Sequence, residues 1–373
     1  MKKSILAASL SAALCLLTSH SVMAQDIPID SSRTDTATDV QVGETAYKAI
    51  GAATFTGASD IDYTLNGRWF RGFEAQQGNS WKISSFNNFT VEFTNPNYQG
   101  DSIGLMAKDN GSIYLHDIAN VSITNLQDQR IQGMDAIPIH AWNGSVTMEN
   151  VGNVTISSRN FGNAIMVQGA NGSVGIDAEG DIRISSNDGA VVVAPFYAGS
   201  DDTPSLSLNG RTIDISSRNQ VALQVYDSWE GNSHPGNTKI ELTAKDSIRL
   251  DGLFGIHQNR NSESHYNTVK TVISAPTVEI SGQRGAILTQ QKENGQIDFG
   301  IRIEAQSVNL TSDGTSATVA TLELGKDTNI EFVNRNSTAR SQVRIAAAAG
   351  DAVDLSQNAN LSFTNADVNV AQG

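Results

Sequence analysis

The pattern apolar-x-apolar-Ser-Ser recurs almost unchanged at Val154–Ser158 (VTISS), Ile182–Ser186 (IRISS) and Ile213–Ser217 (IDISS). Looser copies, without the paired serines, extend the series in both directions along the chain. These copies lie at Val121–Ile123, Ile248–Leu250, Val278–Ile280 and Val308–Leu310. Successive copies begin 28 to 35 residues apart. A fixed spacing of this size indicates an array of structural repeats.

Each repeat contains two further short apolar segments. One precedes the quoted pattern by seven or eight residues, at Val146–Met148, Val174–Ile176, Leu206–Leu208 and Ile240–Leu242. The other follows it after nine to eleven residues, at Ile165–Val167, Val191–Val193, Leu223–Val225 and Ile287–Thr289. One period therefore holds three short strands separated by polar turns, and the patterns of long amphipathic helices are missing.

Strands of this kind have one apolar face each and are too short to form a stable sheet alone. Three of them per period can wind into a triangular coil whose apolar faces all point inward. Stacking such coils about 4.8 Å apart pairs every strand with its equivalent in the next period. The sequence therefore predicts an all-β chain folded as a right-handed parallel β-helix, with three-strand coils of about 30 residues. Leucine-rich repeats are shorter, and propeller blades need antiparallel hairpins.

The first residues have the layout of a secretory signal peptide. Lys2 and Lys3 precede an apolar stretch from Ile5 to Leu17, and Val22-Met23-Ala24 places small residues at the usual positions before a cleavage site. We expect residues 1–24 to be a signal peptide cleaved before Gln25, and the protein to be exported through the Sec pathway. Residues 25–110 repeat less clearly and are expected to form an N-terminal cap and irregular first coils. Residues 111–373 are expected to form the parallel β-helix repeats.

Charge and cysteine content exclude several kinds of partner. The single cysteine, Cys15, lies in the predicted signal peptide, so neither disulfides nor thiolate metal sites are expected in the exported part. The net charge is −14, and removal of Lys2 and Lys3 would make it more negative by two. An acidic surface repels nucleic acids and anionic membranes. We expect no nucleic-acid partner, no membrane span in the exported part, and no cofactor.

A signal peptide followed by a Cys-free, acidic, three-strand solenoid resembles the passenger domains of Gram-negative autotransporters, which belong to type V secretion. The resemblance covers residues 110–373 by their repeats, together with the signal peptide. It implies display at the cell surface or secretion into the medium. Autotransporters also carry a C-terminal translocating β-barrel, and this sequence has no series of amphipathic strands of that kind before Ala371-Gln372-Gly373. The sequence is therefore either a truncated passenger, with an outer-membrane barrel encoded downstream as its partner, or an exported protein that uses another route.

Motifs of known catalytic sites are absent from the sequence. It contains no Gly-x-Ser-x-Gly, His-Glu-x-x-His or Gly-Asp-Ser-Gly. Parallel β-helices also include pectate-lyase-like enzymes, which use clustered carboxylates on one sheet face. The acidic residues here, such as Asp177, Asp181, Asp201 and Asp202, are scattered and fit solvated turns. We therefore expect neither a catalytic residue nor a metal site.

Two features of the turns are candidates for a role. The repeated serines Ser157, Ser185 and Ser216 are expected to stack at one corner, where such ladders satisfy backbone groups of the turns. The turns after the third strand carry aromatic and histidine residues that the repeat places on one lateral edge. Exposed rings there can stack on sugars or anchor a protein, or they can fold back over the corner. The predicted ligand-binding residues are Trp142, Phe196, Tyr197, Tyr226, Trp229, His257 and Tyr266.

These features favour a non-catalytic surface protein, an adhesin or interaction scaffold whose partner is a host glycan or a surface protein. Two alternatives stay open at this point. One is a secreted, pectate-lyase-like enzyme that degrades polysaccharides. The other is a truncated passenger without activity of its own.

Overall fold

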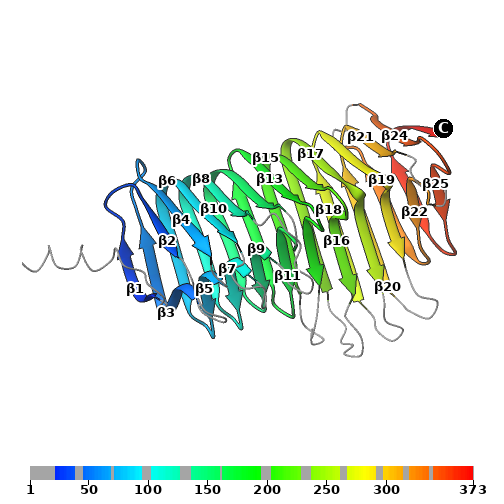
Figure 1. The fold of residues 1–373 in the computed structure, drawn as a ribbon. Coiled ribbons are helices and arrows are strands. Elements are labelled where there is room, and N and C mark those ends of the chain that lie inside the picture. The colour runs from blue at the N-terminus through cyan, green and yellow to red at the C-terminus, as the bar shows by residue number, and fades with distance from the viewer. Residues whose placement is uncertain are drawn as a thin grey trace, which may run out of the picture.

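The computed structural model describes residues 22–37, 45–68, 71–94, 102–126, 136–159, 162–194, 203–227, 237–260, 267–290, 297–313, 319–335 and 339–372. Every regular element in these ranges is a β-strand, and the paired strands run parallel. The strands wind into a solenoid of about 9 turns with a spacing of roughly 31 residues, which confirms the predicted all-β, parallel β-helix (Figure 1). Within these ranges, no helix is long and apolar enough to cross a membrane.

The strands differ in length because several of them bend at a corner of the coil and contribute to two sheets. In chain order they are β1 Val22–Pro28, β2 Arg33–Ala37, β3 Thr45–Thr56, β4 Asp62–Arg68, β5 Arg71–Gln76, β6 Ser80–Thr94, β7 Ser102–Lys108, β8 Ser112–Asn125, β9 Ala136–Trp142, β10 Ser145–Ser158, β11 Ile165–Gln168, β12 Ser173–Ala178, β13 Asp181–Ser186, β14 Val191–Ala194, β15 Ser205–Ser217, β16 Val221–Asp227, β17 Asn237–Arg260, β18 Asn267–Ser274, β19 Thr277–Gln290, β20 Ile297–Glu304, β21 Ser307–Ser312, β22 Leu322–Leu324, β23 Thr328–Val333, β24 Ser341–Ala347, β25 Val353–Leu355, β26 Asn360–Thr364 and β27 Ala366–Gln372.

Three parallel sheets form the faces of the solenoid, and each coil visits them in the same order. The first sheet contains β12, β18, β20, β23 and β26, together with the first parts of β6, β8, β10, β15 and β17. The second contains β2, β4, β13, β21, β24 and β27 with the later parts of β6, β8, β10 and β15, the middle part of β17 and the first part of β19. The third contains β5, β7, β9, β11, β14, β16, β22 and β25 with the ends of β17 and β19.

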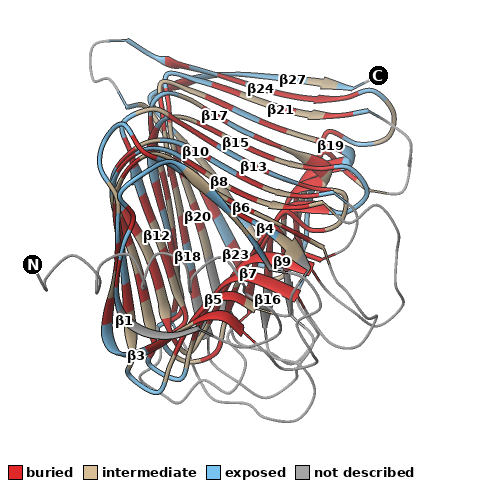
Figure 2. Ribbon diagram, turned by 60° about the vertical axis from the view of Figure 1, so that its left-hand side comes forward, coloured by how far each residue is buried: buried red, intermediate tan, exposed pale blue. Residues whose placement is uncertain are grey.

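The repeated apolar residues form continuous rows inside the solenoid. Val154 pairs with Ile182, which pairs with Ile213 and then Ile248 in successive coils, and all four are at most 1% exposed. The intervening residues, such as Thr155 and its neighbours in the same row, point outward. Figure 2 shows this alternation as bands of buried and exposed residues along the strands. Burial of one β-branched row per sheet is the main stabilising contribution that this repeat can supply.

The interior of the first coils is filled by aromatic rings in place of aliphatic side chains. Tyr47, Phe55, Tyr63, Phe73 and Phe89 contact one another with ring centroids 4.6 to 6.4 Å apart. The strands that carry them pair in the same ladders as the later repeats, as β3 does with β6. The repeat is weak in the sequence here because large rings have replaced the Val and Ile residues that mark it elsewhere.

The two ends of the described solenoid differ in polarity. In β2, Arg33 and Asp35 occupy positions that pair with the buried Tyr63 and Leu65 of the next coil. Asp35 accepts hydrogen bonds from the Tyr47 and Tyr63 hydroxyls at 2.6 and 3.0 Å. Burial, and then the Asp35 charge, raises the pKa of Tyr47. At the other end, apolar side chains are exposed, namely Leu355, Val368 and Val370.

The predicted signal peptide lies mostly outside the described residues. Residues 1–21 are not among them, and Val22–Ala24 form the start of β1, which pairs with β3. The predicted cleavage before Gln25 and the predicted cap over residues 25–110 stay predictions.

A ladder of asparagines lines the outside of the second sheet where its strands begin. Asn153 donates to Asn120, Asn120 donates to Asn88, and each amide bond is 3.0 Å long. Asp62 ends the ladder on one side by accepting from Asn88 at 2.7 Å. On the other side the backbone amide of Asp181 donates to Asn153 at 3.1 Å. Side-chain ladders of this kind add polar contacts between coils at the surface.

Candidate functional site

Of the seven predicted ligand-binding residues, three lie within the described ranges. Trp142 ends β9, Tyr226 lies in β16 and His257 lies in the last part of β17, so all three belong to the third sheet. Trp142 pairs with Gln168, and Gln168 pairs with Ala194. Val193, which precedes Ala194, pairs with Val225, which precedes Tyr226. The remaining four, Phe196, Tyr197, Trp229 and Tyr266, lie outside the described residues. We call the region of Trp142, Tyr226 and His257 the third-sheet edge.

The third sheet differs from the other two because its outward face is also apolar. Ile103, Met106 and Ile137 form a buried cluster that is separate from the main core, and Trp142 and Met166 pack against it. Val221, Phe254 and Leu288 form a second cluster of the same kind further along the solenoid. Strands β7, β9 and β14 are accordingly buried on both faces, which Figure 2 shows for β7 and β9. The outward side chains of these strands are already buried in the structure, and Trp142 and Met166 are the partly buried residues that pack against the first cluster.

Trp142 is the best-defined aromatic residue of the third-sheet edge. Its ring is half-buried against the outer apolar cluster. The Lys108 ammonium lies 4.5 Å from the ring centroid, and the His140 ring stacks on it at 6.0 Å with an interplanar angle of 16°. His140 is itself held by a 3.0 Å hydrogen bond to Gln168. A partly exposed indole beside a cation presents an apolar surface and a donor together, which suits a sugar ring or a protein side chain.

His257 lies in the row of the third sheet that also contains Gln224 and Leu288. Its ring is 5.6 Å from the Phe254 ring, and its Nε2 is 3.4 Å from the Gln290 side-chain oxygen. Burial lowers the pKa of His257 below its usual 6.5, and the Gln290 hydrogen bond opposes this only in part. The structure therefore favours the neutral imidazole at this position.

This pKa shift predicts a loss of stability in acid that depends on His257. Above pH 6.5 the ring is neutral in both the folded and the unfolded chain, so it contributes no pH dependence. As the pH falls below 6.5, the unfolded chain binds a proton first, and folding becomes less favourable. The His257→Gln variant should lose less of its melting temperature over this window than the unsubstituted protein. Equal losses in thermal scans of the two proteins would contradict the assignment.

The serines of the repeat meet at the corner between the second and third sheets, and they stack as predicted. Ser157 pairs with Ser185, and Ser185 pairs with Ser216. The hydrogen bonds to backbone groups of the turns, however, are made by the second serine of each pair. These second serines, Ser158, Ser186 and Ser217, are buried. Ser186 donates to the carbonyl of Gly162 at 2.9 Å and accepts from the amide of Asp188 at 3.0 Å. The second serines therefore satisfy backbone groups of the turns.

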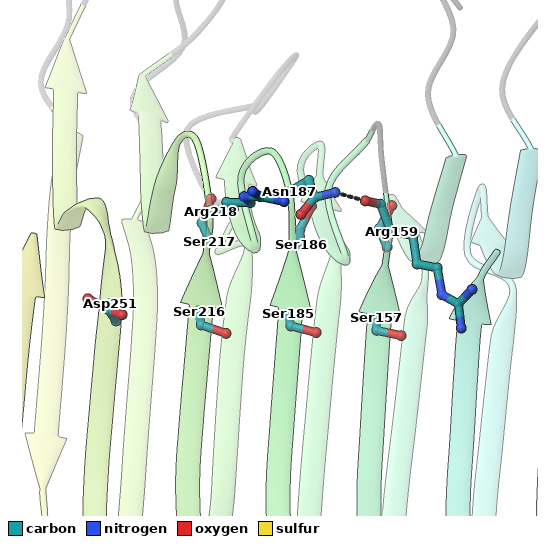
Figure 3. A pocket seen from close by; sticks show the side chains of 10 residues that line it. Ser157, Arg159, Ser185, Ser186, Asn187, Ser216, Ser217, Arg218 and Asp251 are labelled. Atoms are coloured by element: carbon teal, nitrogen blue, oxygen red, sulfur yellow. Dashed lines mark hydrogen bonds between the residues drawn. The ribbon is translucent and has the colours of Figure 1, made fainter. Parts of the chain in front are cut away.

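The first serines of the pairs face an open groove that runs along this corner. The groove has a volume of about 690 Å³ and is lined by Ser157, Ser158, Arg159, Ser185, Ser186, Asn187, Ser216, Ser217, Arg218 and Asp251. Figure 3 shows the hydroxyls of Ser157, Ser185 and Ser216 pointing the same way from neighbouring strands. Hydroxyl, amide and guanidinium groups can bind a polar ligand, and Asp251 is the one carboxylate among the described residues of the lining.

The two serines of one pair should differ sharply in their effect on stability. Replacing Ser186 by Ala leaves the buried carbonyl of Gly162 and the partly buried amide of Asp188 without their partner, and should cost about 1–3 kcal/mol of the free energy of unfolding. Replacing the neighbouring Ser185 by Ala removes an outward hydroxyl and should change it by less than about 0.5 kcal/mol. Urea unfolding of both variants measures the difference. A larger loss for the Ser185 variant would refute the assigned roles.

Sequence patterns did not reveal one polar cluster, on the outside of the first sheet. His116 Nδ1 lies 2.7 Å from a carboxylate oxygen of Asp117, and the Tyr114 hydroxyl donates to Glu149 at 2.7 Å. Hydrogen bonds from Asn150 and His116 lower the pKa of Asp117. In the sequence this cluster consists of Tyr-x-His-Asp at residues 114–117 and Glu-Asn at residues 149–150 in the next coil. That these two segments lie side by side can be seen only once the register of the strands is known. His116 Nε2 is inaccessible, so this ring is poorly placed to act as a general base on a substrate.

The scattered carboxylates of the sequence analysis take structural roles where they are described. Asp181 forms ion pairs with Arg183 and Arg211 at 3.0 and 2.8 Å. The Arg211 hydrogen bond is the main reason that the pKa of Asp181 is lowered. Asp177 accepts a hydrogen bond from Asn209 at 2.7 Å. Among the described residues, no group of three or more His, Cys, Asp or Glu side chains is arranged to hold a metal ion.

Comparison of the chain with protein-family models, with curated proteins and with solved structures finds no match. The assignment of function therefore depends on the geometry of the solenoid itself.

Proposed function

We propose that this protein is an exported β-solenoid that acts at the cell surface or in the medium as an adhesin or interaction scaffold, in the manner of an autotransporter passenger. The observation that carries the proposal is the third-sheet edge. There, a half-buried Trp142 lies beside Lys108 on a sheet whose outward face is apolar. The long, parallel ladders hold this edge rigid, and rigid aromatic anchors lose little conformational entropy on binding.

The proposal of export is supported by the sequence. Its features are the Lys2-Lys3 pair, the apolar stretch Ile5–Leu17 and the absence of cysteine after Cys15. A chain without thiols can pass an oxidising compartment unfolded, because no disulfide can form there. A solenoid also suits this route, since each coil contacts only its neighbours and can fold as it emerges.

Binding at the third-sheet edge can be tested by replacing its aromatic anchor. The Trp142→Ala variant should bind its partner about tenfold more weakly, because a central aromatic side chain often contributes more than about 1.4 kcal/mol to an interface. Attachment to cultured epithelial cells and to an immobilised glycan array measures the effect. The paired substitution Tyr226→Ala with Trp229→Ala tests two more of the predicted ligand-binding residues.

Tyr114→Ala is the matched control, since Tyr114 is an aromatic residue on the first sheet. It should leave attachment unchanged, and all variants should keep the β-rich circular dichroism of the unsubstituted chain. Unchanged attachment of the Trp142 variant and of the paired variant would overturn the proposed edge site. Release of unsaturated products from acidic polysaccharides by the purified protein would instead favour a polysaccharide-degrading enzyme.

A further inference from the structure

The arginines of this protein fall into two groups. Most guanidinium groups that the structure describes are bound to acceptors of the chain, as Arg183 and Arg211 are to Asp181 and Arg302 is to Glu304 and Glu331. Others bind carbonyl or amide oxygens, as Arg335 does with the Ala244 carbonyl. The exceptions are Arg159, Arg218 and Arg284. All three are exposed, and their guanidinium groups have no hydrogen-bond or ion-pair partner among the described residues.

These three arginines lie at the same corner of the solenoid, in the turns that lead from the second sheet to the third. Arg159 follows β10 directly and Arg218 follows β15 directly. Arg284 lies in the corresponding bend of β19, and the Gln283 side chain next to it donates to the Arg218 carbonyl at 3.3 Å. We call this region the arginine corner. Arg159 and Arg218 also line the groove of the serine rows (Figure 3).

The spacing along the arginine corner is regular. Ser158 pairs with Ser186 and Ser186 with Ser217, so Arg159 and Arg218 are two coils apart. Two further coils separate Arg218 from Arg284, because Ser216 pairs with Asp251 and Asp251 with Ser281. With about 4.8 Å between strands, an arginine recurs about every 10 Å along the solenoid. Between the arginines, the turns and strand ends present Asn187 and the hydroxyls of the first serines.

Three carboxylates lie at this corner among the described residues: Asp188 and Asp251 near the groove, and Asp313, which follows β21 one coil beyond Arg284. Asp251 in the groove is already engaged by Arg249 at 2.9 Å and by the Ser281 hydroxyl at 2.6 Å. Asp188 is the other carboxylate in the described turns of the groove, and it also makes contacts within the chain. In a protein of net charge −14, a row of guanidinium groups without a partner among the described residues is a local exception. A guanidinium group binds carboxylate and sulfate groups through paired hydrogen bonds.

We propose that the arginine corner and its groove bind a linear anionic polysaccharide that lies along the solenoid axis. Its carboxylate or sulfate groups bind Arg159, Arg218 and Arg284, while its hydroxyl groups bind Ser185, Ser216 and Asn187. The interval of two coils is close to the length of two sugar rings in an extended chain, which suits a polymer charged once per disaccharide. A nucleic acid fits less well, because the acidic remainder of the surface repels its closely spaced phosphates. This site lies at a different corner from the third-sheet edge and is independent of the function proposed for that edge.

The test uses the purified chain and four polymers of different chemistry. Polygalacturonate carries carboxylates, heparin carries sulfates and carboxylates, dextran is neutral, and poly(dT) is a nucleic acid. Affinity is measured by biolayer interferometry at low and at high salt. We expect binding to polygalacturonate or heparin that weakens at high salt, and no binding to dextran. The better of the two anionic glycans tells whether the site prefers carboxylate or sulfate.

The decisive variant replaces Arg159, Arg218 and Arg284 by Gln, and it should weaken binding to that glycan at least tenfold. The matched control replaces Lys82, Lys245 and Lys270 by Gln, because these exposed lysines lie away from the arginine corner and carry the same total charge. The control should retain binding to within about twofold. All six positions are exposed, so folding should be unaffected, and thermal scans check this.

Three results would overturn the proposal. The first is the absence of binding to both anionic glycans. The second is an equal loss of binding in the arginine variant and the lysine control, which would mean that only net charge matters. The third is tighter binding to poly(dT) than to either glycan, which would identify a nucleic-acid site instead.

Discussion

The parallel backbone ladder between equivalent residues of successive coils is the interaction on which the rest of this structure depends. Each strand is too short to be stable alone, and its amide and carbonyl groups are satisfied only by the coils on either side. In-register pairing forces equivalent residues into rows, as it does for Val154, Ile182 and Ile213. A row must therefore be apolar throughout if it faces inward. The sequence repeat is the consequence of this constraint.

The same constraint organises the outside of the molecule, where equivalent residues also stack. Some outward rows are satisfied within the chain, as in the ladder of Asn88, Asn120 and Asn153. Buried corner serines such as Ser186 likewise serve the turns. Among the described residues, the third-sheet edge and the arginine corner are the two places that we propose for binding. Both repeat along the axis, which suits extended partners better than small ligands.

Much of the fold could be predicted from the sequence, because the interior rows in residues 121–310 consist of Val, Ile and Leu at visible intervals. The short strands predicted at Val146–Met148 and Ile165–Val167 lie in β10 and β11. The second apolar face of the third sheet was not predicted, although uninterrupted apolar stretches such as Val191–Ala194 indicated it. That Arg159, Arg218 and Arg284 have no partner among the described residues could not be predicted, since it depends on which acceptors the register brings near each arginine. For the third-sheet edge, the sequence predicted Trp142, Tyr226 and His257 in the turns after the third strand, whereas the structure places them within strands of the third sheet. The contacts that surround Trp142 were not predicted, because they depend on the register.

The register itself can be measured most directly with paired cysteines, in a chain whose Cys15 has been replaced by Ser. Ser157 and Ser185 are 28 residues apart in sequence but are direct partners in the ladder. Cysteines at these two positions should be bridged readily by dibromobimane, which becomes fluorescent only when both of its arms have reacted with thiols close together. Cysteines at Ser157 and Ser216 are two coils apart and should not be bridged. Equal fluorescence from the two pairs, or bridging of the second pair alone, would contradict the parallel ladder described above.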